Sequence, residues 1–300
     1  MSVEHKRPEG INRDALQSFY FPPPDDLPAN ARKLLEEYSK ISPGEVLPHV
    51  VEVREKAWKV FPYPCIGQFK FLGLALNLQP SYTDILSRLK SGQKFLDVGC
   101  CVGQEVRQLV LDGAAPENLY ASDLHPEFLD IGYDLFKDRE TLTSTMFAAD
   151  TFNTTDSNFV ALNSEIDIIW AGSFLHLFSY AATIDVLKQL IKLSNPKFGS
   201  LIVGKQMGHI DAGEFVIKGS APTGNSPCTT TSTQAGSVEG DETTSLFRHD
   251  AESFKKMWDD VGGQTGTRWA VWVEQKEYQG QAKGVPKGSL SLSFCVERLS

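Results

Sequence analysis

The stretch KFLDVGCCVGQ, residues 94–104, decides the fold. It starts as an apolar run typical of a buried strand and enters a turn that contains Gly99 and Gly103. It then continues into QEVRQLVLDG, which has the composition of a helix ended by Gly113. A strand, a glycine turn and a helix in this order open many α/β cofactor sites. We therefore expect the first strand of a parallel sheet here, with a cofactor at its carboxyl end.

Strands and helices alternate from this turn to the C-terminus. The last helix is amphipathic and is expected to stop at Gly262. The expected strands are 94–99, 118–123, 144–150, 166–172, 199–206, 267–278 and 291–299, and the expected helices are 104–113, 125–139, 180–194 and 249–263. This order predicts an α/β, Rossmann-like, doubly wound domain with a seven-stranded, mostly parallel sheet.

Two further segments complete the expected organisation. Residues 1–90 read as helices and loops, and we expect them to form a helical N-terminal cap, a substrate lid and a candidate contact for a homodimer. Residues 91–300 form the Rossmann-like domain, interrupted by a Ser/Thr/Gly-rich stretch at about 219–245. A stretch of this length and composition is either disordered or an active-site lid.

Composition excludes several classes of function. The net charge is −9, which disfavours a nucleic-acid partner. No apolar run approaches the roughly 20 residues of a membrane helix, and no signal peptide is apparent. Five cysteines without a C-x-x-C pair argue against a disulfide framework and against a zinc or other metal site. We expect a cytoplasmic enzyme that acts on a small molecule.

The acid in the turn indicates which cofactor binds. The turn lacks the G-x-G-x-x-G spacing of dinucleotide sites, and Asp97 would repel a pyrophosphate. S-adenosylmethionine carries an ammonium and a sulfonium, which an acid at the end of the first strand attracts. Gly99 and Gly103 would let backbone N–H groups approach that cofactor closely.

Two more acids end the next strands. Asp123 follows Gly103 by 20 residues and can accept both ribose hydroxyls, and Asp150 can receive an adenine amino group. Taken singly, each acid is as well explained as a solvated strand end or a helix cap. Three acids on the carboxyl edge of one sheet favour a binding site for S-adenosylmethionine.

At these residues the chain resembles class I S-adenosylmethionine-dependent methyltransferases, whose turn reads D-x-G-C-G-x-G, with Cys101 in place of the middle glycine. Together with YPCIGQFKFL, residues 63–72, it resembles fungal secondary-metabolite methyltransferases, including meroterpenoid carboxyl O-methyltransferases of the austinol and terretonin type. The resemblance runs from about Pro48 to the C-terminus. It implies a cradle of Asp97, Gly99, Cys100 and Gly103 for the methionyl end, Asp123 and Leu124 for the ribose, Asp150 and Thr151 for the adenine, and Ala171 and Ser173 beside the sulfonium.

The candidate catalytic residue is His176, directly after the fourth strand, where acceptors approach in this fold. It could remove a phenolic proton or orient a carboxylate, and the competing interpretation is a half-buried structural histidine. The candidate substrate-binding residues lie in the cap and mix polar with apolar groups, although its aromatic residues could equally be core. They are Tyr63, Gln68, Phe69 and Lys70, together with His176.

The favoured function is an O-methyltransferase that esterifies a carboxyl group of a meroterpenoid-type metabolite. Phenol, hydroxyl, carbon or nitrogen methylation stays open, because the fold does not set the acceptor. An NAD-dependent oxidoreductase is disfavoured, since both G-x-G-x-x-G and a catalytic Tyr-x-x-x-Lys are lacking. A non-catalytic protein on the same fold would be expected to have lost the three acids, and all are present.

Overall fold

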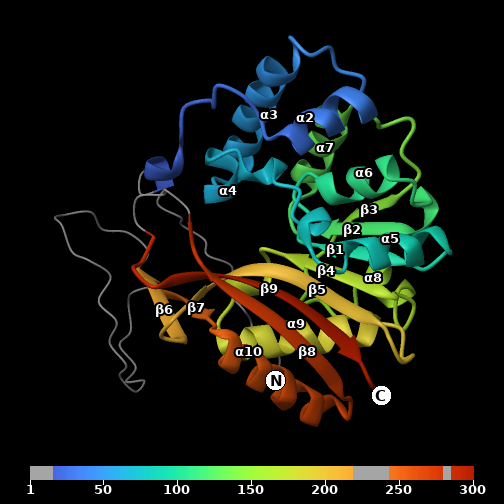
Figure 1. Cartoon of the computed structure of the whole chain (residues 1–300), viewed down its shortest axis with the longest axis vertical. Helices are drawn as coiled ribbons and strands as arrows, with labels where there is room; N and C mark the ends of the chain where they lie inside the picture. Colours follow the sequence, from blue (N-terminus) through green and yellow to red (C-terminus); the bar gives the residue numbers. More distant parts are fainter. Residues whose placement is uncertain (1–15, 219–242, 280–284) are drawn as a thin grey trace.

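The computed structural model describes residues 16–218, 243–279 and 285–300. Seven strands form one twisted sheet in the order β3-β2-β1-β4-β5-β9-β8 (Figure 1). The strands are β1 (Phe95–Val98), β2 (Leu119–Asp123), β3 (Thr145–Ala148), β4 (Ile168–Gly172), β5 (Leu201–His209), β8 (Trp269–Glu277) and β9 (Ser289–Arg298). Strands β1 to β5 are parallel, and β9 is antiparallel to both of its neighbours. The expected doubly wound, mostly parallel α/β sheet is confirmed.

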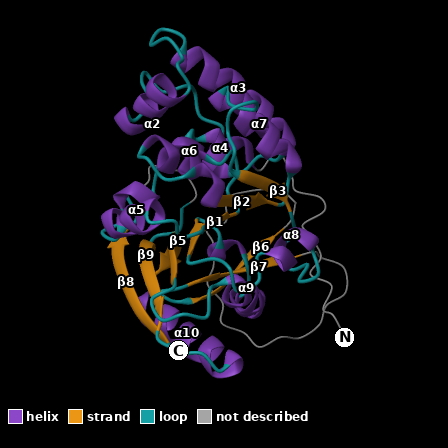
Figure 2. Cartoon of the chain, turned by 90° about the vertical axis from the view of Figure 1, so that its right-hand side faces the viewer, coloured by secondary structure: helices purple, strands orange, loops and turns teal. Residues whose placement is uncertain are grey.

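Helices cover both faces of the sheet (Figure 2). One face carries α5 (Tyr82–Lys90), α6 (Gln104–Leu111) and α7 (Pro126–Phe136), and the other carries α8 (Ser157–Ala161), α9 (Tyr180–Leu193) and α10 (Ala251–Thr265). Alternation along each strand sends side chains to the two faces in turn. Leu96 of β1 thus packs in the core under α9 and α10, whereas its neighbour Phe95 packs in the core with α5 and α6.

The N-terminal region forms a helical layer against α7. Its elements are η1 (Gln17–Phe19), α2 (Ala29–Lys33), a π-helical turn η2 (Leu34–Tyr38), α3 (Val46–Val60), α4 (Pro64–Gly67), η3 (Lys70–Leu72) and η4 (Leu76–Leu78). Val46, Val50, Val53 and Ala57 line one buried face of α3 and share a core with Phe128 of α7. The expected cap helices are therefore present, and their role as a substrate lid stays a prediction.

Two features differ from the sequence-based expectation. Helix α10 does not stop at Gly262 but continues to Thr265 and ends at Gly266, which has a left-handed φ of 66°. Gly262 is instead required for packing, because a Cβ there would lie 2.7 Å from the Thr267 carbonyl oxygen. The stop prediction failed because both glycines look alike in sequence, and only the tertiary contact separates them.

The second difference is a hairpin between β5 and α10. Strands β6 (Gly213–Lys218) and β7 (Thr243–Arg248) pair antiparallel as a separate two-stranded sheet. Strand β7 begins inside the stretch 219–245 that was expected to lack structure, so this expectation is wrong for 243–245. The remainder of that stretch, 219–242, lies outside the described residues. The short turns η5 (Pro116–Asn118) and η6 (Leu175–Leu177) complete the fold.

Candidate active site

The site lies where the strand order reverses. After β1 the chain moves outward to β2 and β3, and it then returns to place β4 on the other side of β1. In such sheets a crevice opens at the carboxyl ends of the two diverging strands, and ligands bind there. Asp97 is the third residue of β1, Asp123 ends β2, and Asp150 follows β3. Because these parallel strands are adjacent, the fold brings the three acids to one edge, as the sequence predicted.

The turn after β1 adopts an unusual backbone. Gly99, Cys101 and Gly103 all have a left-handed φ, of 68°, 53° and 68°. A residue with a Cβ pays about 1–2 kcal/mol in this region, and the Cys101 amide offsets part of that by donating to Asp123 Oδ2 over 2.8 Å. Gly99 is also needed for space, since a Cβ there would lie 2.6 Å from the Phe174 ring. Cys101 thus keeps the turn conformation although it replaces a glycine.

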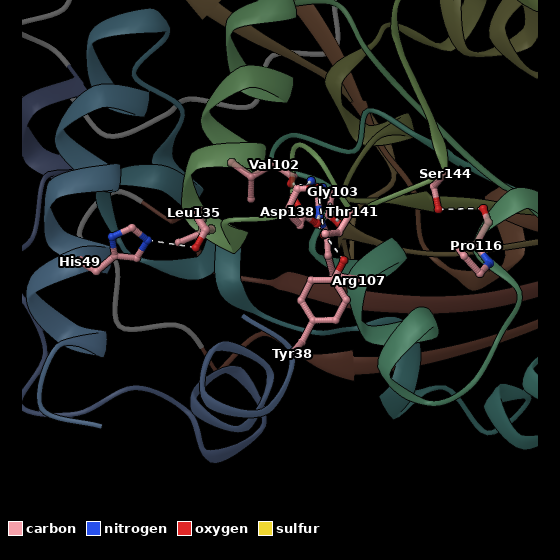
Figure 3. A network of polar contacts seen from close by, with 10 residues as sticks. All are labelled: Tyr38, His49, Val102, Gly103, Arg107, Pro116, Leu135, Asp138, Thr141 and Ser144. Carbon is pink, nitrogen blue, oxygen red and sulfur yellow. Dashed lines mark hydrogen bonds and ion pairs between the residues drawn. The ribbon is translucent and has the colours of Figure 1, made fainter. Parts of the chain in front are cut away.

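A buried arginine forms hydrogen bonds with the backbone of the turn (Figure 3). Arg107 Nη1 donates to the carbonyl oxygens of Val102 and Gly103, at 2.9 and 3.3 Å. Its Nε and Nη2 form a bidentate ion pair with the carboxylate of Asp138, at 2.9 and 3.0 Å. Tyr38 of the N-terminal layer donates to Asp138 Oδ2 over 2.8 Å. The glycine turn is therefore linked through two buried charged groups to the cap.

Two buried carboxylates near the turn each have an oxygen without a hydrogen-bond partner among the described residues. Asp97 is 2% exposed, and its Oδ2 makes no hydrogen bond with any described residue. Burial, followed by the nearby Glu105 and Asp123 carboxylates, raises the pKa of Asp97 well above its usual range. Glu105 Oε1 accepts hydrogen bonds from the backbone amides of Ala75 and Leu76. Its buried Oε2 has no partner among the described residues. Burial raises the pKa of Glu105 to about 7. A bound cation would favour the ionised forms of these two acids, so they fit the cationic methionyl end of S-adenosylmethionine.

Asp123 is the next acid along the edge. Its two oxygens each accept one backbone N–H, from Cys101 and from His125, the latter at 3.0 Å. A carboxylate has about four acceptor positions, so both oxygens can still receive ribose hydroxyls. Leu124 beside it is 37% exposed. The Tyr63 ring of the cap packs against His125 and Phe128, and its pKa is raised by burial and then by the Asp123 carboxylate.

The remaining expected cofactor residues also reach this edge. Asp150 Oδ1 accepts the Phe152 amide over 3.0 Å, and Thr151 next to it is buried. Ala171 is fully buried near the end of β4, and Ser173 follows with a left-handed φ of 56°. The Ser173 amide donates to the Lys205 carbonyl oxygen of β5, which holds the segment after β4 against the sheet.

His176 lies in η6, three residues beyond Ser173. Its Nδ1 accepts the backbone N–H of Met207 over 3.4 Å, so the neutral ring carries its proton on Nε2. Burial, followed by the positive charge of Arg248, lowers the pKa of His176 to about 3. The Arg248 Nη1 donates to the His176 carbonyl oxygen over 2.6 Å. A neutral imidazole donor and a guanidinium therefore lie together beside the end of β4.

The structure separates the cap candidates. Phe69 is buried against the Arg54 guanidinium, 4.4 Å from it, and lies within the core of the N-terminal layer. Lys70 is exposed and donates to the Tyr278 hydroxyl over 2.8 Å, which joins the cap to the end of β8. Gln68 is half-buried between them. Tyr63 is near enough to the sheet edge for the Asp123 carboxylate to raise its pKa, after burial. The substrate role of all four cap residues stays a prediction.

Sequence reasoning missed three charged residues of this region. Glu105 and Arg107 lie on α6, and both are nearly fully buried. The sequence gives no clear signal for their burial, because the polar residues Gln104 and Gln108 lie beside them on the same helix. Arg248 follows the polar stretch that interrupts the domain. Only its hydrogen bond to the His176 carbonyl oxygen shows that it lies beside the candidate site.

Comparison with known proteins identifies the family. Residues 19–72 match the family model described as "Meroterpenoid methyltransferase N-terminal domain". The chain is 45% identical to the O-methyltransferase phiE of a fungal species, over 82% of this chain and 76% of that protein. It is 39% identical to the O-methyltransferase atr3 of Stereocaulon alpinum, over 98% and 79% of the two chains. It is 36% identical to the Asnovolin E/Chermesin D methyltransferase nvfJ of Aspergillus novofumigatus, over 89% and 88%.

The chain belongs to the fungal meroterpenoid methyltransferase family. A SAM-dependent methyltransferase of known structure from Methanosarcina mazei superimposes with a TM-score of 0.48 at 14% identity, over 73% of this chain and 98% of that one. The expected enzyme class, a methyltransferase, is confirmed by the sequence relatives, and the buried acids in and near the turn suit S-adenosylmethionine as the methyl donor.

Two negative findings concern the described part of this methyltransferase. Within residues 16–218, 243–279 and 285–300, no cluster of three or more histidine, cysteine, aspartate or glutamate side chains could hold a metal ion. Over the same ranges, no helix combines the length and apolar character needed to cross a bilayer.

Proposed function

We propose that this methyltransferase transfers the methyl group of S-adenosylmethionine to a carboxylate of a meroterpenoid-type small molecule. The relatives support the metabolite class: one is named for asnovolin E and chermesin D, and the matching family model carries the word meroterpenoid. The arrangement of His176 and Arg248 beside β4 supports a carboxyl group as the methyl acceptor.

The protonation state of His176 favours a carboxylate over a phenol or an alcohol as the methyl acceptor. A phenol or alcohol acceptor benefits from a general base whose pKa lies near the working pH. With a pKa of about 3, His176 is a poor base at neutral pH. A carboxylate is already ionised and needs no base. The neutral ring, whose Nδ1 is occupied by the Met207 amide, can instead donate from Nε2 to a carboxylate oxygen.

The roles of the chain's own residues follow from this. When bound, S-adenosylmethionine supplies an electrophilic methyl group on a cationic sulfur. Asp97 and Glu105 would hold the ammonium, Asp123 the ribose and Asp150 the adenine side, while Ala171 and Ser173 would lie beside the methyl group. Transfer is an in-line displacement, so the protein contributes alignment and exclusion of water rather than proton transfer.

Product analysis tests the proposal. The protein is incubated with labelled S-adenosylmethionine and with hydroxybenzoic acids that carry a farnesyl chain, alongside their methyl esters. Each acid offers both a carboxyl and a phenol group. We expect a methyl ester from each acid and no product from the esters, as read by mass spectrometry and NMR. Methyl ethers or ring-methylated products would establish a phenol or carbon methyltransferase instead.

A second test addresses His176. We expect kcat/KM for an acid to show no ionisation near the usual histidine pKa between about pH 5 and 8, because the ring stays neutral there. His176→Ala should lower kcat/KM on the order of tenfold or more through loss of a hydrogen bond to a charged group. His176→Gln, which keeps a donor, should recover part of the rate. A variant that retains full activity would remove His176 from the mechanism.

Two broader properties belong to the same proposal. The cysteines Cys65, Cys100, Cys101 and Cys295 are free thiols, which suits an enzyme of the reducing cytoplasm. A homodimer through the helical N-terminal layer is proposed on its helical character alone, and light scattering of the purified protein measures it directly.

A further inference from the structure

Arg248 is a cation beside the acceptor side of the site. Its chain neighbours Phe247 and His249 point toward α9 and α10, where they make edge-to-face ring contacts with Tyr180 and Phe254. Because side chains alternate along a strand, Arg248 points to the opposite face. There its Nη1 donates to the His176 carbonyl oxygen over 2.6 Å. The hairpin strand β7 thus delivers a guanidinium to the segment that follows β4.

The charge of Arg248 is not balanced by the described part of the chain. The guanidinium is half-buried, and no carboxylate of the described residues lies within ion-pair distance of it. Its one hydrogen bond to a described residue uses Nη1, so Nε and Nη2 have no partner among the described residues and can donate to a ligand. Burial lowers the pKa of Arg248 to about 10, which still leaves it charged at neutral pH. A partly desolvated cation without a counter-ion gains free energy when an anion binds to it.

Building on the proposed function, we propose that Arg248 binds the acceptor's carboxylate and thereby selects acids over their esters. A guanidinium presents parallel N–H donors that match the two oxygens of a carboxylate. His176 lies next to it, and its Nε2–H has no partner among the described residues, so the two residues can hold one carboxylate between them. In the proposed binding mode, Ala171 and Ser173 would lie beside the methyl group, so an acceptor held by Arg248 and His176 after β4 would have its oxygen near that group.

The chemistry of the step agrees with this role. A lone pair of one carboxylate oxygen forms the new bond to the methyl carbon, and the electrons of the breaking carbon–sulfur bond go to sulfur, which becomes a neutral thioether. No proton moves. The product ester is neutral, so its ion pair with Arg248 is lost on transfer. Arg248 therefore favours binding of the acid and release of the ester.

Binding measurements with the variants Arg248→Gln and Arg248→Lys test the assignment. The protein is saturated with S-adenosylhomocysteine, so that no turnover occurs, and titrated with a farnesylated hydroxybenzoic acid and with its methyl ester. We expect Arg248→Gln to raise the Kd of the acid on the order of 10- to 100-fold and to leave that of the ester unchanged. Arg248→Lys should lie between, because it keeps the charge without the bidentate geometry. Arg268→Gln, an exposed arginine just before β8, is the matched control and should change neither Kd.

Further readouts separate this assignment from the alternatives. We expect the Kd of S-adenosylhomocysteine and the melting temperature to stay unchanged in Arg248→Gln, with KM for the acid raised in turnover assays. Weaker cofactor binding with unchanged acid binding would overturn the assignment, because Arg248 would then hold the cofactor's own carboxylate. Esterification of acids with an unaltered KM in Arg248→Gln would overturn the role of Arg248 and leave the proposed function intact. A protein that methylates only phenols would overturn both.

Discussion

Individual acidic residues dominate the carboxyl edge of β1 and β2, where we propose that the cofactor binds. Asp97 and Glu105 are both buried, and each has an oxygen without a partner among the described residues. Burial, and then the nearby Glu105 carboxylate, raises the pKa of Asp97. Such a pair destabilises the folded protein when both members are charged, unless a cation binds between them. The free energy that the fold gives up here is recovered when a positively charged ligand binds.

Asp123 offers a direct test of the edge. We expect Asp123→Ala to weaken the binding of S-adenosylhomocysteine by about 1–3 kcal/mol, the range for a hydrogen-bonding group left without its charged acceptor. Calorimetry measures the affinity. Asp123→Asn is the matched variant, because one amide oxygen can still accept the Cys101 or the His125 N–H. An unchanged affinity in Asp123→Ala would contradict the ribose assignment.

The raised pKa of Glu105 should make the stability of the folded protein depend on pH. Its pKa rises from 4.5 to about 7 on folding, so between these values the folded state binds more protons than the unfolded state. The free energy of unfolding therefore falls as the pH rises through this window, by up to about 1.4 kcal/mol per pH unit. Glu105→Gln should remove this contribution.

Urea unfolding of the cofactor-free protein at pH 5 and pH 8 gives the comparison. The stability advantage of Glu105→Gln over the wild type should grow with pH, on the order of 1–3 kcal/mol. Because glutamine can still accept the Ala75 and Leu76 amides, the variant isolates the charge. An advantage independent of pH would show that Glu105 titrates normally.

At the scale of elements, the turn between β1 and α6 depends on support from outside itself. Gly103 has a left-handed φ, and a Cβ there would lie 2.5 Å from Arg107 Nη1. The glycine is thus required by its conformation and by the close approach of the guanidinium that binds the turn's carbonyl groups. Asp138 after α7 and Tyr38 of η2 hold that guanidinium in turn.

We expect Arg107→Met to destabilise the protein by about 3–5 kcal/mol, because it leaves the Asp138 carboxylate buried and unpaired. Chemical denaturation measures this loss. The double variant Arg107→Met/Asp138→Leu should be less destabilised than the single variant, since it removes both charges. Arg139→Met is the control, because its ion pair with Asp130 is exposed and worth less than about 1 kcal/mol.

At the scale of the whole molecule, the cap and the sheet meet on two sides of the site. Tyr38 joins the cap to the glycine turn through Asp138, and Lys70 joins it to the end of β8 through Tyr278. Figure 1 shows the N-terminal helices on one side of the sheet edge and the β6–β7 hairpin across from them. The acceptor groups of the proposal, His176 and Arg248, come from the hairpin side.

Lys70 tests whether the cap contributes to acceptor binding. We expect Lys70→Met to change the free energy of unfolding by less than about 1 kcal/mol, because the contact is exposed. KM for the acid should rise while the Kd of S-adenosylhomocysteine stays unchanged. Tyr278→Phe removes the same hydrogen bond and should behave alike. Equal KM values for both variants and the wild type would assign the cap a purely structural role.

Local sequence patterns determined the strands, most helices and the cofactor edge of this methyltransferase. Apolar runs, the glycine turn and acids at successive strand ends are short-range signals, and parallel strands necessarily gather their carboxyl ends on one edge. For that reason the amino-acid sequence alone is enough to place Asp97, Asp123 and Asp150 together.

Only the tertiary structure decided which polar groups face one another across the chain. Gly262 and Gly266 differ by a contact with Thr267, and Arg107 meets Asp138 across 31 residues. Arg248 reaches His176 across 72 residues, after the chain has crossed a hairpin. Burial and pairing of charges depend on such distant neighbours, so the protonation of His176 and the lack of a counter-ion for Arg248 among the described residues follow from the fold and not from local sequence.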